Sequence, residues 1–341
     1  MPLLPFLHRI ARREHLSADE AQAAMTVLLS AAPSPAQAAA LLVALHMKGE
    51  TADELAGFAR AMRLAARRVE VDGPVLDSCG TGGSGVNTFN ISTVAAFVIA
   101  GAGVKVAKHG NRSITSLCGS ADVLEALGIR IDLEPDQIAA AIREVGIGFM
   151  LAPRMHPAMA HVQSVRRDLK LRTAFNLLGP LANPAGARFQ IIGTPTAEAA
   201  ALVANALSQL DVDHAYVVSG LDGLDEITTT GPTLVFEVWP GRIEKHLWTP
   251  ADFGVPHATL EDLTGGDPAA NASIARAILG GETGPRRDIV LVNAAAGLMA
   301  AGVAKDFLGA VSIAARSIDS GAAKRALDAL AGFAKPIAPT S

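Results

Sequence analysis

The chain has 341 residues, half of them hydrophobic, and a formal net charge of −4 at pH 7. A nucleic-acid-binding protein usually has an excess of basic residues, which this chain lacks. No uninterrupted apolar run approaches the roughly 20 residues that span a membrane. Two cysteines make neither a disulfide framework nor a zinc site. Because the N-terminus also lacks the pattern of a signal peptide, we expect a cytoplasmic protein in a reducing compartment.

Residues 1–70 have the pattern of three or four short helices. Ser17 and Thr51 each begin a hydroxyl-x-x-Glu sequence, the form of a capping box at a helix N-terminus. The helices carry broad apolar stripes but no cluster of reactive side chains. We therefore expect a small helical domain over residues 1–72, joined by part of 170–190, whose apolar face makes an interface.

Residues 73–341 are predicted to form an α/β domain with a central, mostly parallel sheet, because short β runs alternate with helical segments. Strands or short apolar runs are expected near 75–76, 104–106, 129–133, 147–151, 189–193 and 215–219, and a hairpin over 233–248. Helices are expected over 120–127, 135–145, 156–169 and 196–210 and through most of 267–334, with an irregular but packed loop over 172–184.

A glycine-rich turn follows the first predicted strand of this domain. Four glycines lie within six positions over residues 80–85, and a helix is expected to begin near Ser92 and Thr93. Without Cβ atoms the backbone can bring several N–H groups close to an anion, and the helix dipole adds favourable potential. Such a turn also commonly does no more than connect a strand to a helix, so this motif alone leaves both interpretations open.

A second polar loop, residues 108–112, follows the next predicted strand. The carboxyl ends of two consecutive parallel strands lie at the same edge of a sheet, where α/β folds bind ligands. Lys108, His109 and Arg112 would meet hydroxyl side chains there, with almost no carboxylate. This composition favours a site for phosphate or pyrophosphate over a solvated charged loop.

A third strand end carries acidic residues. Asp222, Asp225 and Glu226 follow the strand near 215–219. Acidic turns are usually only solvated, but oxygen ligands beside a phosphorylated substrate would suit Mg²⁺. The two cysteines, Cys79 and Cys118, lie inside the two glycine loops, and we interpret them as small buried residues rather than catalytic ones.

Taken together, these motifs closely resemble those of the anthranilate phosphoribosyltransferases, over essentially the whole chain. The matching segments are residues 80–85, 88–93, 108–113, 119–128, 172–184, 223–226 and 293–298. The resemblance implies a small helical domain, a large α/β domain, an active site in the cleft between them, and a homodimer formed through the helical domain. It also implies transfer of the phosphoribosyl group of 5-phosphoribosyl 1-pyrophosphate (PRPP) to the amine of anthranilate, the second step of tryptophan biosynthesis.

The resemblance also implies the residues of the site. PRPP would be bound by Gly80, Gly83, Ser84, Thr88, Asn90, Ile91, Ser92, Thr93, Lys108, His109, Gly110, Asn111, Arg112, Ser113, Ile114, Thr115, Ser116 and Ser120. Anthranilate would contact Gly80, His109, Asn111 and Arg166, and Arg166 would bind the carboxylate of anthranilate. Mg²⁺ would be held by Ser92, Asp225 and Glu226. Neither a covalent nucleophile nor a firm general base is expected. This chain departs from the family at Ser84, where an aspartate is usual.

Two other functions are compatible with parts of the pattern. A pyrimidine-nucleoside phosphorylase would have a similar fold and a related glycine–lysine–serine site, but residues 172–176 and the Asp225–Glu226 pair argue against it. A non-catalytic nucleic-acid-binding relative would need a basic surface, and the net charge of −4 argues against that.

Overall fold

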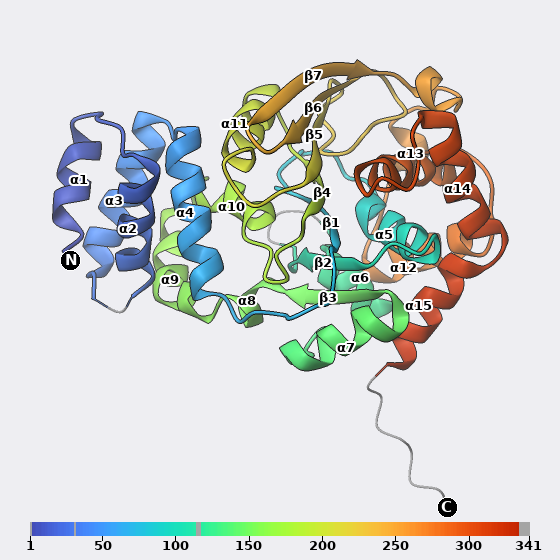
Figure 1. The fold of residues 1–341 in the computed structure, drawn as a ribbon, viewed down its shortest axis with the longest axis horizontal. Helices are drawn as coiled ribbons and strands as arrows, with labels where there is room; N and C mark the ends of the chain where they lie inside the picture. Colours follow the sequence, from blue (N-terminus) through green and yellow to red (C-terminus); the bar gives the residue numbers. More distant parts are fainter. Residues whose placement is uncertain (1, 31, 114–116, 334–341) are drawn as a thin grey trace, which may run out of the picture.

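The structure is a computed structural model that describes residues 2–30, 32–113 and 117–333. Helices α1 to α4 gather at one side of the molecule, and a sheet covered by helices on both faces forms the larger part (Figure 1). The N-terminal helices are α1 (Leu4–Ala11), α2 (Ala18–Leu29), α3 (Pro35–Lys48) and α4 (Ala52–Ala65).

Capping boxes fix the starts of three of these helices. The hydroxyls of Ser17 and Thr51 each accept from the backbone N–H three residues later, as the sequence predicts, and Ser34 forms a third box. Glu54 completes its own box and is fully buried, where it pairs with Lys48 at 2.8 Å and accepts a bond from the N–H of Leu16 at 3.0 Å. A buried carboxylate needs such partners, so this pair ties α2, α3 and α4 together.

The strands among the described residues form one sheet, in the order β3-β2-β1-β4-β5-β6-β7. Its strands are β1 (Leu76–Gly80), β2 (Val106–Gly110), β3 (Ile147–Leu151), β4 (Phe189–Gly193), β5 (His214–Gly220), β6 (Thr233–Trp239) and β7 (Arg242–Trp248). The first five are parallel, while β6 and β7 form an antiparallel hairpin at one edge. The predicted fold class is confirmed.

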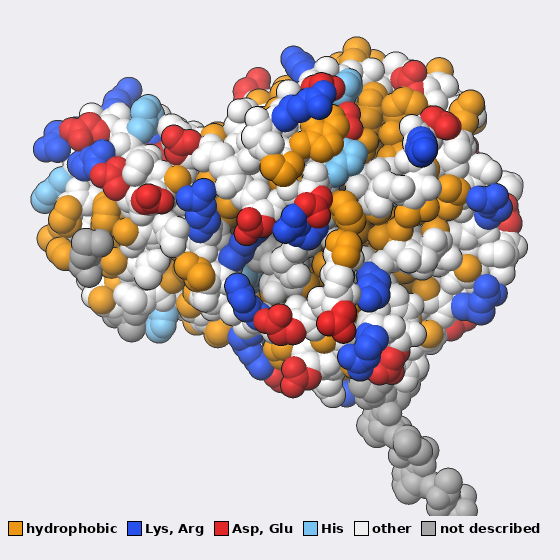
Figure 2. Space-filling view, viewed as in Figure 1, with side chains coloured by type: hydrophobic (Ala, Val, Ile, Leu, Met, Phe, Trp, Pro, Cys, Tyr) orange, Lys and Arg blue, Asp and Glu red, His pale blue; other side chains and the backbone are white. Residues whose placement is uncertain are grey.

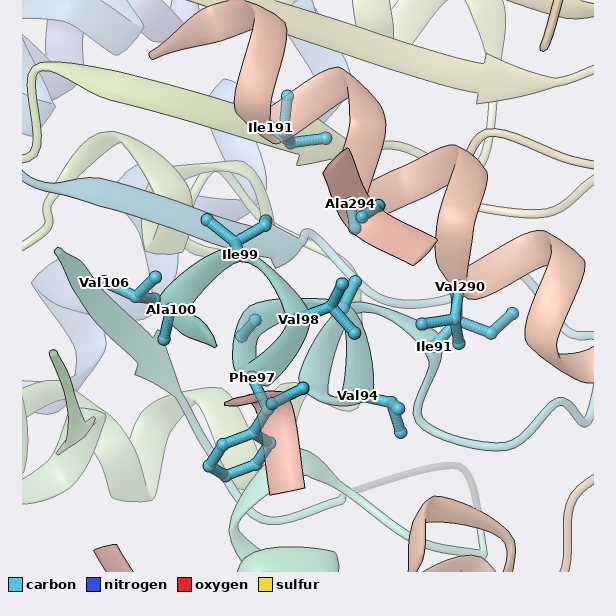
Figure 3. Close-up of a cluster of buried hydrophobic side chains, with 14 of the residues drawn as sticks. Ile91, Val94, Phe97, Val98, Ile99, Ala100, Val106, Ile191, Val290 and Ala294 are labelled. Carbon is cyan, nitrogen blue, oxygen red and sulfur yellow. The ribbon is translucent and has the colours of Figure 1, made fainter. Parts of the chain in front are cut away.

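The sheet separates the two larger of three hydrophobic cores among the described residues. Successive strand residues face opposite sides, so Ile191 packs into the core around α5 (Ile91–Gly101) while Ile192 packs against the N-terminal helices. Figure 3 shows α5 directing Val98 and Ile99 toward Ile191 and the helix that carries Ala294. Helix α5 is buried on nearly every side, which explains why its sequence is a continuous apolar run.

The remaining helices connect the strands and complete the two layers. Between the parallel strands lie α6 (Ser120–Ala126), α7 (Pro135–Val145), α8 (Ala152–Met155), η1 (Pro157–Met159), α9 (Ala160–Leu169), α10 (Phe175–Leu181) and α11 (Ala197–Leu207). After the hairpin come η2 (Pro250–Phe253), η3 (Glu261–Leu263), α12 (Pro268–Leu279), α13 (Pro285–Ala300), α14 (Phe307–Asp319) and α15 (Ala322–Gly332).

Several sequence-based boundaries need correction. The predicted strand over 129–133 is not a strand: its isoleucines and leucine are buried in alternation, but the segment pairs with no neighbouring strand. The loop predicted over 172–184 is packed, as expected, but it contains α10, which has Pro180 inside it. The first strand continues to Gly80, and the second runs from Val106 to Gly110 rather than ending at Val106, so Lys108 and His109 are strand residues. A short 3-10 turn precedes α9, where one continuous helix was predicted.

The surface is mixed in charge. Figure 2 shows acidic and basic side chains interspersed over one face, with no single basic patch spreading across it. None of the helices that the structure describes is long and apolar enough to cross a membrane.

Candidate active site

The carboxyl ends of β1, β4 and β5 bring the first glycine loop against the acidic turn. Gly80 pairs with Gly193 in the sheet, and the N–H of Thr81 donates to the Gly193 carbonyl at 2.8 Å. A Cβ on Gly80 would lie 2.7 Å from the carboxylate of Asp225, and one on Gly193 would overlap the Asp225 carbonyl. Glycine is therefore required on both strands because the acidic turn occupies the space of a side chain.

Asp225 and Glu226 meet the hydroxyls of the first loop. Asp225 accepts hydrogen bonds from the Ser84 hydroxyl and the Gly82 backbone, and Glu226 accepts from the Ser92 hydroxyl and, at 3.1 Å, from the Ser92 N–H. Burial raises the pKa of both carboxyls, and the charge of Asp225 raises that of Glu226 further. The structure thus brings together the three residues expected at a metal.

This donor set fits a divalent cation. Two adjacent carboxylates with raised pKa values lack sufficient compensating charge, and their hydrogen-bond donors are neutral hydroxyls and amides. Carboxylate and hydroxyl oxygens are the ligands that Mg²⁺ prefers. Ser92, Asp225 and Glu226 are the residues that would hold it.

The third acidic residue of this turn has a structural role. Asp222 accepts bonds from the hydroxyls of Thr228 and Thr230 and, at 3.0 Å, from the N–H of Leu224, so it shapes the turn instead of joining the pair. On the other side, Asn293 of α13 bonds both the N–H and the carbonyl of Ile227, at 3.0 and 2.8 Å. Asn293 therefore fixes the backbone next to Glu226, a role that sequence reasoning did not assign.

Lys108 is a buried cation at the centre of this edge. It is only 2% exposed, and its ammonium donates to the Ser78 carbonyl. Its charge acts to lower the pKa of both Asp77 and Glu226, although burial raises each of them more. Lys108 thus links the first strand end to the acidic turn electrostatically.

His109 is held by a buried polar network. The backbone N–H of His109 donates to one carboxylate oxygen of Asp77 at 3.1 Å, and the Asn183 side chain donates to the other oxygen at 2.7 Å. The ring lies with Nδ1 at 3.1 Å from the Gly179 carbonyl and its centroid at 5.2 Å from the ring of His156. Burial lowers the pKa of His109 to about 3, so the ring is neutral at physiological pH.

The rest of the second loop is ordered by side chains of α6. Ser120 bonds the N–H and the carbonyl of Asn111, at 3.2 and 3.1 Å, and closely approaches Gly110. Arg112 pairs with Asp122 and Glu125, which raises its pKa, and Ser113 donates its N–H to Asp122 at 3.0 Å. The predicted residues Ile114, Thr115 and Ser116 lie outside the residues that the structure describes.

Residues at the start of α5 complete the first loop. Asn90 bonds Cys118 and, at 3.0 Å, Asn271, while Thr88 forms an isolated bridge with Thr264. The remaining predicted residues at this end of α5 are Ile91 and Thr93, both of which are buried. The cysteine interpretation holds for Cys118, which is buried; Cys79 is partly exposed, yet burial of its thiol raises its pKa well above the usual value.

Arg172 is a residue of this site that sequence reasoning did not single out. A Cβ on Gly83 would overlap its guanidinium, which also donates to the Gly82 carbonyl at 3.3 Å and acts on the Asp225 charge. The guanidinium of Arg172, from a segment distant in the sequence, therefore lies against the glycine loop. The available signal was the Arg172-Thr173 motif, which the resemblance included without a role.

Arg166 lies on α9 and packs against α10. Its guanidinium sits 5.1 Å from the ring centroid of Phe175, and burial lowers its pKa. Arg166 therefore contacts α10 through the Phe175 side chain, whereas His109 reaches the backbone carbonyl of Gly179 on the same helix. The neighbouring Arg167 is exposed.

Comparisons with known proteins agree over nearly the whole chain. Residues 72–324 match the glycosyl transferase family a/b domain, and residues 4–66 match the helical bundle domain of that family. A protein from Solibacter usitatus named anthranilate phosphoribosyltransferase is 59% identical over 337 residues, which cover 98% of this chain and 99% of that protein. The chain belongs to the anthranilate phosphoribosyltransferase family. Another member, from Moorella thermoacetica, is 51% identical over 328 residues, covering 96% of this chain and 97% of its own.

Solved structures of the family show the same fold. The Thermus thermophilus anthranilate phosphoribosyltransferase is 43% identical, with a TM-score of 0.90 over 96% of this chain and 98% of its own. The Saccharomyces cerevisiae protein, solved in complex with PRPP and Mg, is 29% identical, with a TM-score of 0.89 over 97% of both chains. The predicted family and enzyme class are confirmed, and neither the nucleoside phosphorylase nor the nucleic-acid-binding alternative receives support.

The close approach at Gly193 gives a test of the site geometry. We expect Gly193→Ala to displace the acidic turn, because its Cβ would overlap the Asp225 carbonyl, and to lower kcat/KM at least about tenfold. Gly231→Ala is the matched control, since a Cβ there would meet no atom within 4 Å and its backbone is not left-handed. Steady-state kinetics and thermal unfolding of both variants make the measurement, and equal activities would contradict the proposed contact.

Proposed function

We propose that this chain transfers the phosphoribosyl group of PRPP to the amine of anthranilate, releasing pyrophosphate, in tryptophan biosynthesis. The observation that carries the proposal is the contact between the glycine loop and the Asp225–Glu226 pair. Family membership supports it, as do the yeast complexes with PRPP and Mg and with 4-fluoroanthranilate. The individual residue assignments that follow belong to the proposal.

The acidic turn and the glycine loop would bind the pyrophosphate end of PRPP. Mg²⁺ held by Ser92, Asp225 and Glu226 would supply charge neutralisation for the departing pyrophosphate. The loop N–H groups and the guanidinium of Arg172 act on the same anion, and they are preorganised because the loop already contacts the acidic turn and Arg172. A good leaving group makes a covalent nucleophile unnecessary.

Arg166 and His109 would orient anthranilate. The guanidinium can pair with the carboxylate in fork geometry. Because Nδ1 of His109 faces the Gly179 carbonyl, the proton sits on Nδ1, and Nε2 keeps a lone pair that no described residue engages by a hydrogen bond. That lone pair can accept from the anthranilate amine, while a pKa of about 3 makes the ring a poor base, so His109 positions the amine without removing its proton.

Assembly and location are further parts of the proposal. A homodimer formed through the helical domain, residues 1–72, is supported by exposed apolar side chains on three of its helices: Leu4 is 40% exposed, Met47 70% and Leu64 68%. Residues 73–341 would form the catalytic domain. We also propose a cytoplasmic location, as biosynthetic relatives and two cysteines that form no disulfide with each other suggest.

The proposed reaction is tested by following the fluorescence of anthranilate. We expect its consumption to require both PRPP and Mg²⁺, and the double variant Asp225→Asn/Glu226→Gln to lose about 100-fold or more in kcat/KM, since the metal ligands are gone. The amides keep the size of the carboxyls, so thermal unfolding should stay cooperative. Near-normal turnover by the double variant at modest Mg²⁺ would contradict the assignment.

Arg166 should act on the aromatic substrate. We expect Arg166→Ala to raise the KM for anthranilate about 10- to 100-fold, the cost of losing a charge-assisted hydrogen bond, with a much smaller effect on the KM for PRPP. Arg167→Ala is the matched control because Arg167 is the exposed neighbour on the same helix. A larger anthranilate defect in the Arg167 variant would show that the wrong arginine was assigned.

Ser84 should tune the metal requirement. Its hydroxyl donates to Asp225, so Ser84→Asp would place a second negative charge against that carboxylate. We expect apparent PRPP affinity to depend more steeply on Mg²⁺ in the aspartate variant, by roughly fivefold, which corresponds to about 1 kcal/mol for one partly screened charge contact. Mg²⁺ titrations at fixed ionic strength measure this effect, and superimposable curves would show that the substitution is electrostatically silent.

A further inference from the structure

We propose a second metal site, separate from the acidic pair, on the hairpin of β6 and β7. Its ligands are Glu237, Glu244 and His246, whose ligating atoms all lie within 4.8 Å of one another. One imidazole nitrogen and two carboxylate oxygens suit Zn²⁺ or a similar divalent transition metal, with water in the remaining position.

The strand register places the cluster on one face of the sheet. Tyr216, Glu237 and Glu244 lie directly opposite one another on β5, β6 and β7. His214 and His246 are each two residues along their strands, so they share that face. Two carboxylates directly opposite across a strand pair repel each other, so a cation between them would relieve that repulsion.

The side chains around Glu237 reserve one of its oxygens. Nε2 of His214 lies 2.7 Å from Oε1, and the Tyr216 hydroxyl donates to the same oxygen at 3.2 Å. His214 is itself held by the Ala300 carbonyl, 3.2 Å from Nδ1. These contacts fix the carboxylate and leave Oε2 facing His246, an arrangement typical of the groups that orient a metal ligand.

Glu244 is arranged in the same way. Arg242 donates to its Oε1, and the guanidinium of Arg242 is itself stacked 4.7 Å from the ring centroid of Trp239. The other oxygen, Oε2, lies 3.9 Å from Nε2 of His246. In both Glu237 and Glu244, one carboxylate oxygen accepts a hydrogen bond from a neighbouring side chain, and the other oxygen faces Nε2 of His246.

His246 supplies the observation that points to a ligand. Its Nε2 is buried and lies at ion-pair distance, 3.0 Å, from Glu237 Oε2, yet it makes no contact with the geometry of a hydrogen bond to a described residue. Atoms that share a tetrahedral ion at about 2.1 Å are themselves roughly 3.4 Å apart, and the distances of 3.0 and 3.9 Å bracket that value. The side chains of His246 and Glu244 are 34% and 41% exposed, so an ion and its water can enter.

The cluster lies far from the proposed chemistry. His214 is at the amino end of β5, whereas Asp225 follows its carboxyl end, and a strand of this length spans roughly 20 Å. Figure 1 shows β6 and β7 at the outer edge of the sheet. A metal here would link the edge strand β7 to β6, so its expected effect is on the stability of that edge and not on the reaction.

The two tryptophans of the chain make the site directly observable. Trp239 stacks on His214 at 5.1 Å between ring centroids, and Trp248 contacts Tyr216 at 4.8 Å. The full chain, freed of metal by a chelator and kept in excess Mg²⁺, would be titrated with Co²⁺. We expect saturable quenching at one equivalent, reversed by Zn²⁺, with at least tenfold more Co²⁺ required by His246→Gln and by Glu244→Gln.

His257→Gln is the matched control, because His257 is exposed and outside the cluster, and it should titrate like the parent. Zn²⁺ should also raise the Tm of the parent and of this control but not of His246→Gln. Glu244→Gln changes a half-exposed side chain and keeps the test valid if the His246 variant folds poorly. Equal quenching in the parent and the cluster variants, or no Tm response to Zn²⁺, would overturn the proposal and leave the cluster as ion pairs alone.

Discussion

The contact between the Asp225 backbone and Gly193 is the constraint on which the rest of the proposed site depends. Two carboxylates can approach the first loop only because β1 and β4 both end in glycine, and burying them there raises their pKa values. The surrounding groups offset that cost: Ser84 and Ser92 donate to them, Lys108 and Arg172 supply positive charge, and Asn293 fixes the turn. The negative charge that remains uncompensated is what a divalent cation would neutralise.

The second loop illustrates how a strand differs from a loop as a place for binding residues. Lys108 and His109 lie within β2, so their backbone is fixed by the ladder to β3 and by Asp77. Burial makes the histidine neutral, whereas the lysine finds a carbonyl and nearby carboxylates. The same strand therefore offers a neutral imidazole and a cation, which the proposed function assigns to the amine and to the anionic substrate.

Local patterns predicted most of this architecture because they record local physics. Capping boxes at Ser17 and Thr51, glycines at strand ends and apolar runs each depend on neighbouring residues, so they could be interpreted from the sequence. The prediction of a strand over 129–133 was wrong because alternating burial does not require a partner strand. Arg172 was missed because its role depends on a glycine about 90 positions earlier in the chain, a juxtaposition that only the tertiary fold creates.

The strand β5 carries different chemistry at its two ends for a topological reason. Along its length β5 pairs with β4 on one side and with β6 on the other. The chain leaves the carboxyl end of β5 through the acidic turn, which contacts the glycines that end β1 and β4. Near the amino end of β5, side chains of β5, β6 and β7 stand directly opposite one another on one face. Parallel strands end at the same edge of a sheet, and opposite residues of neighbouring strands share one face. The acidic turn is thus a product of the strand ends, and the histidine–glutamate cluster is a product of the strand register.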